Sequence, residues 1–272
     1  MKLYFLIAGY LIFLSSTSFA QTQDNSKPFV LGKTQQIYST VLKENRTLNI
    51  YLPEDYSPDS VATYPVIYLL DGSANEDFIH IVGLVQFLTM IEKMPKAIVV
   101  GIANVDRKRD FTFPTTIKQD LIDYPTTGKS EKFIAFIEKE LQPFIAEKYK
   151  TNTSKTIIGQ SLGGLLATEI LIRKPQLFDN YVIISPSLWW NNESLLTDAT
   201  RFIPNIKPDT RIYISVGEEG KQMKNDAKKL ADLIQINKKL KITFVPLIQE
   251  NHLTILHNSA YKGLEIVFSK KN

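Results

Sequence analysis

The stretch that decides the fold reads Thr156-Ile-Ile-Gly-Gln-Ser161-Leu-Gly-Gly-Leu165. An apolar, β-branched run leads directly into the pattern Gly-x-Ser-x-Gly, and the residues that follow have helical character. This order predicts that Ser161 occupies a one-residue turn between a buried strand and a helix, with its hydroxyl above the sheet at the positive end of the helix dipole. Such a sharp turn calls for glycine on both sides, here Gly159 and Gly163. We predict that Ser161 is a nucleophile, and the alternative is a serine that only caps the helix.

Short, almost wholly apolar runs alternate with segments of helical periodicity through the rest of the chain. This alternation is typical of an α/β domain with a mainly parallel sheet covered by helices on both faces. Before these runs, the segments 36–42 and 46–52, joined by the polar turn Lys43-Glu44-Asn45, predict an antiparallel hairpin at one edge of the sheet. The expected strands are 36–42, 46–52, 66–70, 97–101, 156–159, 181–185, 211–216 and 241–246, the expected helices are 78–93, 129–150, 162–174, 221–237 and 253–269, and 104–127 and 189–207 are expected to be loops.

The N-terminus has the pattern of a leader. A short positive start, an apolar run over residues 3–14 and small residues near the cleavage point predict a signal peptide of residues 1–20, with an uncleaved anchor as the alternative. Residues 21–33 are expected to be a flexible lead, and residues 34–272 a single domain. The mature protein is therefore expected to be exported, to the periplasm or out of the cell.

The composition excludes several kinds of site. The 272 residues include no cysteine, which rules out disulfides, thiolate nucleophiles, cysteine-bound zinc and iron–sulfur clusters. Lys and Arg total 32 against 28 Asp and Glu, a net charge of +4 without a dense basic run, so nucleic acid is not an expected partner. With 44% hydrophobic residues, the chain can bury a full-sized core.

A serine nucleophile needs a base, and the chain offers three histidines. His80 and His257 fall inside expected helices, whereas His252 follows the last expected strand. His252 should therefore project from a loop at the carboxyl edge of the sheet, which also carries Ser161. We predict His252 as the general base, with a structural loop histidine as the alternative. The spacing of His252 and His257 puts them on different faces of a helix, so a zinc pair is not expected.

The acid that orients this histidine should come from the loop Gly217-Glu218-Glu219-Gly220, after the strand at 211–216. We predict Glu219, because Glu218 directly follows the turn glycine and is expected to point outward. The alternative is that both carboxylates cap the next helix, where the helix dipole favours them.

Two backbone groups are the expected donors to an oxyanion. The first is the N–H of Leu162, directly after the nucleophile. The second is the N–H of Ser73, in the loop Asp71-Gly72-Ser73 that follows the strand at 66–70. The Asp71 side chain is expected to hold this loop in place rather than to react.

Two segments at the same edge offer candidates for substrate binding. Trp190, which follows Trp189 after the strand at 181–185, is predicted to line an acyl or aryl pocket, with core packing as the alternative. Arg109, close to Arg107 in the loop after the strand at 97–101, could clamp an anionic substrate. The alternative for Arg109 is an ion pair that holds the loop.

A family resemblance is carried by the segments Pro65-Val-Ile-Tyr-Leu-Leu-Asp-Gly72, Gly159-Gln-Ser-Leu-Gly-Gly-Leu165, Ser185-Pro-Ser-Leu-Trp-Trp190, Val216-Gly-Glu-Glu219 and Asn251-His-Leu253. Together they resemble the esterase D-like family of α/β-hydrolases, and the Ser-Pro-Ser-x-Trp-Trp segment is most similar to its enterochelin-type siderophore esterases. The resemblance implies an α/β-hydrolase fold, a Ser-Asp/Glu-His triad, and ester cleavage through an acyl-enzyme without a metal or organic cofactor. The acid position varies within this family, and some members use a serine–histidine pair, so the resemblance supports Glu219 less than it supports Ser161 and His252.

These observations lead to one expected function. The chain should be a secreted serine esterase that acts on a small-molecule ester, such as a siderophore or a carbohydrate-linked ester. One alternative is an acyltransferase that uses the same site. The other is a binding protein without turnover on a hydrolase scaffold, because fold alone does not establish function.

Overall fold

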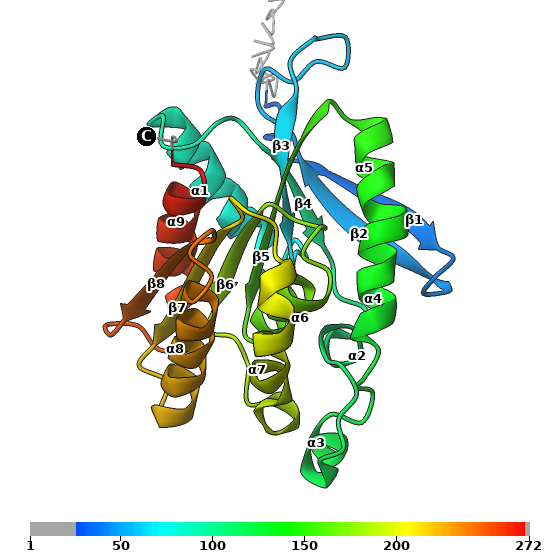
Figure 1. Ribbon diagram of the computed structural model, residues 1–272. Coiled ribbons are helices and arrows are strands. Elements are labelled where there is room, and N and C mark those ends of the chain that lie inside the picture. Colours follow the sequence, from blue (N-terminus) through cyan, green and yellow to red (C-terminus); the bar gives the residue numbers. More distant parts are fainter. Residues whose placement is uncertain (1–25, 270–272) are drawn as a thin grey trace, which may run out of the picture. The chain divides into compact units, whose positions relative to one another are not determined.

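The strands form a single mixed sheet in the computed structural model, which describes residues 26–269 (Figure 1). They are β1 (Lys33–Ser39), β2 (Glu44–Tyr51), β3 (Tyr64–Leu69), β4 (Ile98–Ile102), β5 (Thr151–Gln160), β6 (Asn180–Ile184), β7 (Arg211–Gly217) and β8 (Lys241–Leu247). Their order is β1-β2-β4-β3-β5-β6-β7-β8; β2 pairs antiparallel with β1 and β4, and the other neighbours are parallel. The predicted sheet with its antiparallel N-terminal hairpin is confirmed, whereas the predicted signal peptide, residues 1–20, lies outside the described residues.

Helices cover both faces of this sheet (Figure 1). One face carries α1 (Phe78–Met90) and α9 (Ile255–Val267). The other carries α4 (Ser130–Phe136), α5 (Gln142–Lys148), α6 (Leu162–Arg173), α7 (Trp190–Phe202) and α8 (Lys221–Gln235), with a π-helical turn (Ile137–Leu141) between α4 and α5. Within residues 26–269, no helix has the length and apolar character needed to cross a membrane.

Each face of the sheet has its own hydrophobic core. Because side chains alternate along a strand, neighbours in β5 belong to opposite cores: Ile157 packs toward α6, and Ile158 packs toward α1 and α9. Val182 and Ile183 in β6 divide in the same way. Residues at consecutive positions must therefore all be apolar, which explains the unbroken apolar runs of the sequence.

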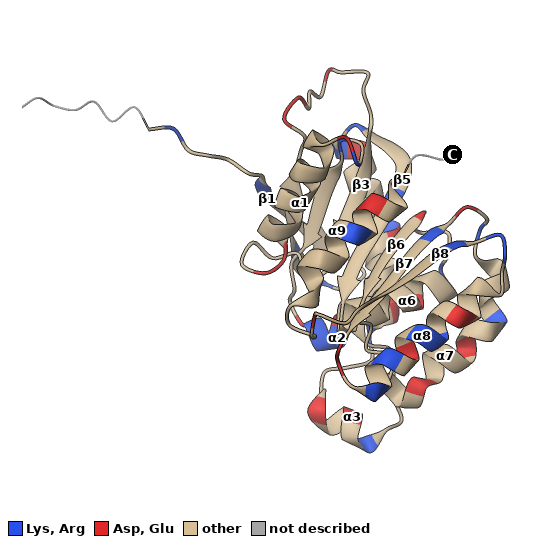
Figure 2. Cartoon of the chain, turned by 90° about the vertical axis from the view of Figure 1, so that its left-hand side faces the viewer, with Lys and Arg blue, Asp and Glu red and all other residues tan. Residues whose placement is uncertain are grey.

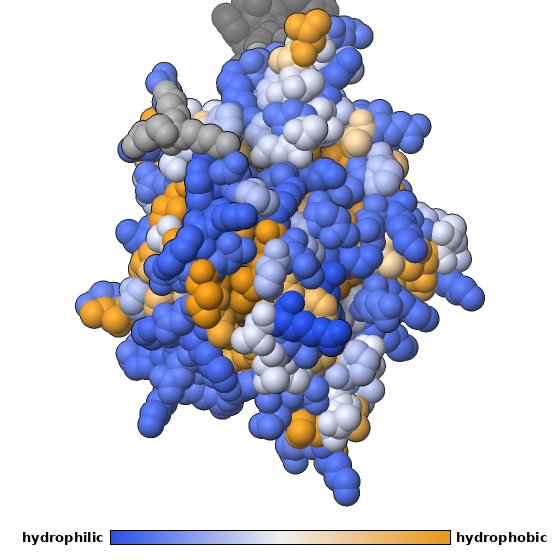
Figure 3. Space-filling model, viewed as in Figure 1, coloured by the Kyte–Doolittle hydropathy of each residue, from blue (hydrophilic) through white to orange (hydrophobic). Residues whose placement is uncertain are grey.

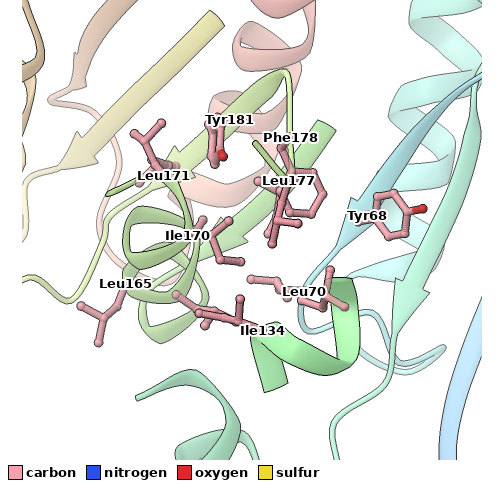
Figure 4. Close-up of a cluster of buried hydrophobic side chains, with 14 of the residues drawn as sticks. Tyr68, Leu70, Ile134, Leu165, Ile170, Leu171, Leu177, Phe178 and Tyr181 are labelled. Carbon is pink, nitrogen blue, oxygen red and sulfur yellow. The ribbon is translucent and has the colours of Figure 1, made fainter. Parts of the chain in front are cut away.

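The core beneath α6 fixes the position of the turn at Ser161. Leu165 and Ile170 of α6 are fully buried, and they lie beside Leu70, Ile134 and Phe178 (Figure 4). Apolar contact along the whole helix is what holds its first residue against the end of β5.

Two expected loops contain helices. The segment 104–127 includes the short helices α2 (Arg107–Phe111) and α3 (Lys118–Asp123), and most of 189–207 is α7 followed by a 3-10 turn (Ile203–Asn205). The positive φ angles of Asn191, Asn192 and Glu193 interrupt α7 near its start, which hides its periodicity in the sequence. After the interruption, Leu195, Leu196 and Ala199 form the buried side of the helix.

A buried ion-pair network joins β2 to α2 and α4. The Arg46 side chain is fully buried, and its Nη1 donates to Asp110 Oδ2 at 2.7 Å and to Glu44 Oε1 at 2.9 Å. Its guanidinium also lies 5.1 Å from the centre of the Phe133 ring of α4. A cation this deep in the protein is stable only because carboxylates neutralise it.

The surface carries both charge signs, and basic residues gather around α2 (Figure 2). Hydrophobic residues are exposed between α7 and α8 (Figure 3), where a hollow of about 460 Å³ is lined by Ile203, Pro204, Ile206, Leu233 and Ile236, among others. Ile203, Pro204 and Ile206 lie in the segment that leads into β7, and Leu233 and Ile236 lie at the end of α8, before β8. The hollow is therefore near the amino ends of these strands. Ser161 follows the carboxyl end of β5, so the hollow and Ser161 lie at opposite ends of the strands.

Removal of one buried carboxylate from this network should lower the free energy of unfolding. Asp110→Ala leaves Arg46 without its shortest partner, so we expect the free energy of unfolding to fall by about 3–5 kcal/mol. Asp232→Ala is the matched control, because Asp232 pairs with Lys228 on the exposed face of α8 and should cost at most about 1 kcal/mol. Urea denaturation of both variants measures the difference, and equal small losses would contradict a structural role for the network.

Candidate active site

Ser161 occupies a strained turn that joins β5 directly to α6. Its φ and ψ are 60° and −120°, a combination that residues with a side chain rarely adopt. Its N–H donates to the carbonyl of Ile184 at 3.0 Å, and its carbonyl accepts from the N–H of Leu165 at 2.9 Å. A side chain at Gly159 would meet the Gly163 carbonyl oxygen at 2.4 Å, so strand and helix can approach only because Gly159 has none.

His252 lies on the loop between β8 and α9, where it faces Glu219 at the end of β7. His252 Nδ1 and Glu219 Oε2 are 2.6 Å apart. The His252 side chain is 40% exposed, whereas that of Glu219 is only 2% exposed. Because β5, β7 and β8 run parallel, these loops and the turn at Ser161 leave the sheet at the same edge.

Glu219 is held as a carboxylate by several donors. Its Oε1 accepts a hydrogen bond from Ser185 Oγ at 2.5 Å and another from the Gly217 N–H at 2.9 Å. Burial by itself raises the pKa of Glu219, but these bonds and the one from His252 outweigh it and hold the pKa below its ordinary value of 4.5. An ionised carboxylate only accepts, so Nδ1 of His252 carries the proton in this contact.

Glu218 has a different environment from its neighbour. Its side chain is 56% exposed and pairs with Lys224 on α8. Its N–H donates to the carbonyl of Glu250 at 2.7 Å, which joins the end of β7 to the histidine loop. The structure thus places Glu219, and not Glu218, against His252.

The two predicted oxyanion donors are the backbone N–H groups of Leu162 and Ser73. Leu162 is the first residue of α6, so its N–H has no carbonyl partner within the helix. In the loop after β3, the N–H of Gly72 donates to the Ile102 carbonyl at 3.0 Å and is therefore not available to an oxyanion. The next N–H along the chain is that of Ser73. That Leu162 and Ser73 bind an oxyanion stays a prediction.

The Asp71 side chain holds this loop, as predicted. Its carboxylate accepts from Arg107 Nε at 2.6 Å, from Arg107 Nη2 at 2.9 Å and from Asn104 Nδ2 at 2.7 Å. Arg107 Nη2 also lies 3.3 Å from the carbonyl oxygen of Gln160, to which it donates. Arg107 therefore ties the loop after β3 to the residue before Ser161.

Trp190 is a core residue, which corrects the prediction that it lines a pocket. Its side chain is fully buried, and its Nε1–H donates to the Phe113 carbonyl at 2.8 Å. Its ring also packs edge-on against Tyr124, with 5.4 Å between ring centres. The indole is buried although the polar residues Asn191 and Asn192 follow it, and the left-handed φ angles of these two residues interrupt the helix at this point.

Arg109 holds its loop by ion pairs, which corrects the prediction that it clamps a substrate. Its Nε donates to Asp110 Oδ1 at 2.7 Å, and its Nη2 donates to Glu44 Oε1 at 2.5 Å. These carboxylates belong to the network around Arg46, so the Arg109 charge is already neutralised within the protein.

The other two histidines lie in helices, as predicted, and contact each other. His80 of α1 and His257 of α9 are hydrogen-bonded, with His80 Nε2 2.8 Å from His257 Nδ1 and the rings stacked 5.0 Å apart. In the part of the chain that the structure describes, no group of three or more His, Asp or Glu side chains is placed to hold a metal ion.

The sequence reasoning missed the contacts of Ser185 and Ser187. Ser185 donates to Glu219, as described above, and Ser187 Oγ lies 3.4 Å from Ser161 Oγ. Both serines lie in the segment that leaves β6, the strand that pairs with β5 beside Ser161. Polar residues at the carboxyl end of a neighbouring strand are the signal that could have identified them.

Lys108, Tyr124 and Trp189 form an aromatic–lysine cluster. Lys108 Nζ is 4.6 Å from the centre of the Tyr124 ring, and the Tyr124 and Trp189 rings are 6.1 Å apart. Trp189 is half-buried and follows Ser187 by two residues, and Lys108 follows Arg107. The cluster combines aromatic surface with a positive charge, close along the chain to Arg107 and Ser187, which contact Gln160 and Ser161.

The sheet order, the helices on both faces and the strained serine turn define an α/β-hydrolase fold. A family model described as "Putative esterase" matches residues 39–255. The chain belongs to this family, and membership supports hydrolysis of ester bonds. The family resemblance inferred from the sequence motifs is thereby confirmed.

Curated relatives include esterases of siderophores. The ferri-bacillibactin esterase BesA of Bacillus subtilis (strain 168) is 29% identical over 260 residues, which cover 85% of this chain and 88% of that protein. A siderophore enterobactin esterase of Emericella nidulans is 43% identical over 79 residues, 28% of this chain and 26% of that protein.

Solved structures agree with this relationship. An IroE-like serine hydrolase from Shewanella oneidensis superposes with a TM-score of 0.79 at 31% identity, covering 87% of this chain and 80% of that one. The BES protein from Bacillus cereus gives the same TM-score and identity, over 91% of this chain and 100% of that one. The enterobactin esterase FES from Shigella flexneri, at 20% identity and a TM-score of 0.71 over 88% of this chain and 60% of that one, shares the fold.

Glu219→Gln should flatten the acid dependence of stability. Because the folded pKa lies below 4.5, the carboxylate contributes stability that is complete above that pH and is lost as the pH falls through the folded pKa. The variant lacks this titrating group, so its free energy of unfolding should change less than that of the wild type between about pH 5 and pH 3. Urea denaturation at several pH values tests this. An unchanged slope in Glu219→Gln would refute a role for this carboxylate in the acid dependence of stability.

Proposed function

We propose that this protein is a serine esterase with Ser161 as nucleophile, His252 as base and Glu219 as the acid that orients the base. The observation that carries the proposal is the 2.6 Å contact between His252 Nδ1 and the buried Glu219 carboxylate, at the sheet edge that bears the strained Ser161 turn. Membership in an esterase family supports the same reaction class.

The proposed reaction begins with attack of Ser161 Oγ on the ester carbonyl carbon. Since Nδ1 of His252 is bound to Glu219, Nε2 is the nitrogen left to take the hydroxyl proton. Glu219, held by Ser185 and Gly217, stabilises the imidazolium that results. His252 then gives the proton to the leaving alcohol, and an acyl-enzyme remains.

Water completes the cycle in the same geometry. His252 takes a proton from the water, whose oxygen attacks the acyl carbon, and Ser161 leaves with that proton as the free acid forms. Both steps place a negative charge on the former carbonyl oxygen, which we assign to the N–H groups of Leu162 and Ser73. A single donor of this kind contributes about 2.7–4 kcal/mol in known cases.

We propose siderophore-type esters as the substrate class. Relatives named for ferri-bacillibactin and enterobactin support this choice, as does the aromatic–lysine cluster, since aromatic faces and a cation suit an electron-rich aromatic acyl group. We also propose export to the periplasm or the exterior, on the basis of the leader pattern in residues 1–20.

Ser161→Ala should abolish ester hydrolysis and leave the fold intact, because alanine fits the turn but has no nucleophile. We expect a loss of about 10⁴-fold or more in kcat for Ser161→Ala and for His252→Ala, with the double variant scarcely worse than either. A panel of nitrophenyl and catecholate esters measures turnover, and a fluorophosphonate measures covalent labelling. Activity of Ser161→Ala above about a hundredth of wild type would exclude this nucleophile.

Glu219→Gln should cost much more activity than Glu218→Gln. An amide at position 219 can present its NH₂ group to Nδ1 and favour the wrong tautomer, so we expect kcat to fall by about 10²–10⁴-fold. Glu218 points to solvent and serves as the matched control, with kcat expected within about twofold of wild type. Equal small losses in both variants would indicate a serine–histidine pair without an acid.

A further inference from the structure

The side chain of Gln160 reaches from the nucleophile's strand to the histidine loop. Gln160 Nε2 lies 2.6 Å from the backbone carbonyl oxygen of His252 and donates to it. A carbonyl only accepts, so the amide NH₂ group, and not the amide oxygen, must face it. This bond joins the residue next to Ser161 to the backbone of the proposed base.

The histidine loop has few other bonds to the rest of the protein: the Glu218 N–H holds the Glu250 carbonyl, and Glu219 holds the His252 ring. Leu253 is 91% exposed, so the residue after His252 has almost no packing. Several bonds of the loop are internal, such as Leu253 N–H to Asn251 Oδ1 and Asn251 N–H to Thr254 Oγ1. Internal bonds give the loop a shape but do not set its distance from Ser161.

Gln160 itself is firmly placed. It pairs with Ile184 at the end of the β5–β6 ladder, and its carbonyl accepts from Arg107 Nη2. Its backbone is therefore a fixed point, one peptide bond away from the nucleophile.

We propose that Gln160 is a positioning residue that sets the distance between His252 and Ser161. The proposal rests on the function assigned above to these two residues. Glu219 orients the ring through Nδ1, and Gln160 holds the backbone of the same residue, so the imidazole is located at two points. Only a base within hydrogen-bond reach can take the serine proton. A displacement of the base by about 1 Å can lower the rate by about 10²-fold.

Gln160→Met tests the bond, because methionine has a similar length and no donor. We expect kcat to fall by about 10- to 100-fold while KM stays within about twofold, since substrate contacts are unchanged. Gln160→Lys places an N–H donor at a similar reach and should recover much of the lost kcat. A loss of kcat below about twofold in Gln160→Met, or no recovery in Gln160→Lys, would overturn the proposal.

Gln142→Met is the matched control. Gln142 Nε2 also donates to a buried backbone carbonyl, that of Leu177 at 3.0 Å, but at the amino end of α5. This variant should lower the melting temperature and keep kcat per folded molecule within about twofold. If Gln142→Met lowers kcat as much as Gln160→Met does, the effect of Gln160 is only a general loss of stability, and the proposal fails.

A measurement without turnover separates this proposal from the function on which it rests. The chain has three histidines, so their imidazole signals can be assigned in ¹⁵N spectra by single substitution. Gln160→Met should broaden the Nδ1–H signal of His252 by faster exchange, whereas Gln142→Met should not. If Ser161→Ala still hydrolyses esters, the proposed function fails, and this signal alone decides whether Gln160 holds His252: broadening supports that role, and an unchanged signal overturns it.

Discussion

The contact between Gly159 and the carbonyl of Gly163 is the constraint on which the rest of the structure depends. The missing side chain at Gly159 lets β5 pass directly into α6 through one residue, and Ser161 takes up the strain with a positive φ. The strain persists because the buried apolar side of α6 and the pairing of β5 with β3 and β6 fix both arms of the turn. The energy that shapes the site therefore comes from the two hydrophobic cores.

The parallel sheet then collects the remaining groups at one edge. Strands β6, β7 and β8 are successive neighbours beyond β5, so Ser185, Glu219 and His252 emerge side by side although they are far apart in the sequence. A second set of contacts stiffens this edge: Arg107 links Asp71 to the Gln160 carbonyl, and the Gln160 side chain reaches the His252 backbone. Much of the site is thus held by side chains that bond to backbone atoms or to each other.

The elements that the sequence predicts well are those with dense local signals. Apolar β-branched runs identified the strands of the sheet, because a strand covered on both faces is mostly apolar. The choice of His252 among three histidines also followed from position, since only that histidine lies outside an expected helix and after a strand. Trp190 and Arg109 were misjudged because their partners, the Phe113 carbonyl and the Glu44 and Asp110 carboxylates, come from other segments.

The sequence by itself determined the α/β architecture, the turn that carries Ser161 and the loop that carries His252, because each depends on the order and polarity of adjacent residues. Only the tertiary structure decided that Glu219 faces His252 while Glu218 faces solvent, that Trp190 belongs to the core, and that Gln160 reaches the histidine loop. Each of these contacts joins two segments that are far apart in the sequence, so it depends on how the sheet and the helices place those segments in space. Side-chain direction and burial at such places are set by packing against distant segments, and no local pattern encodes them.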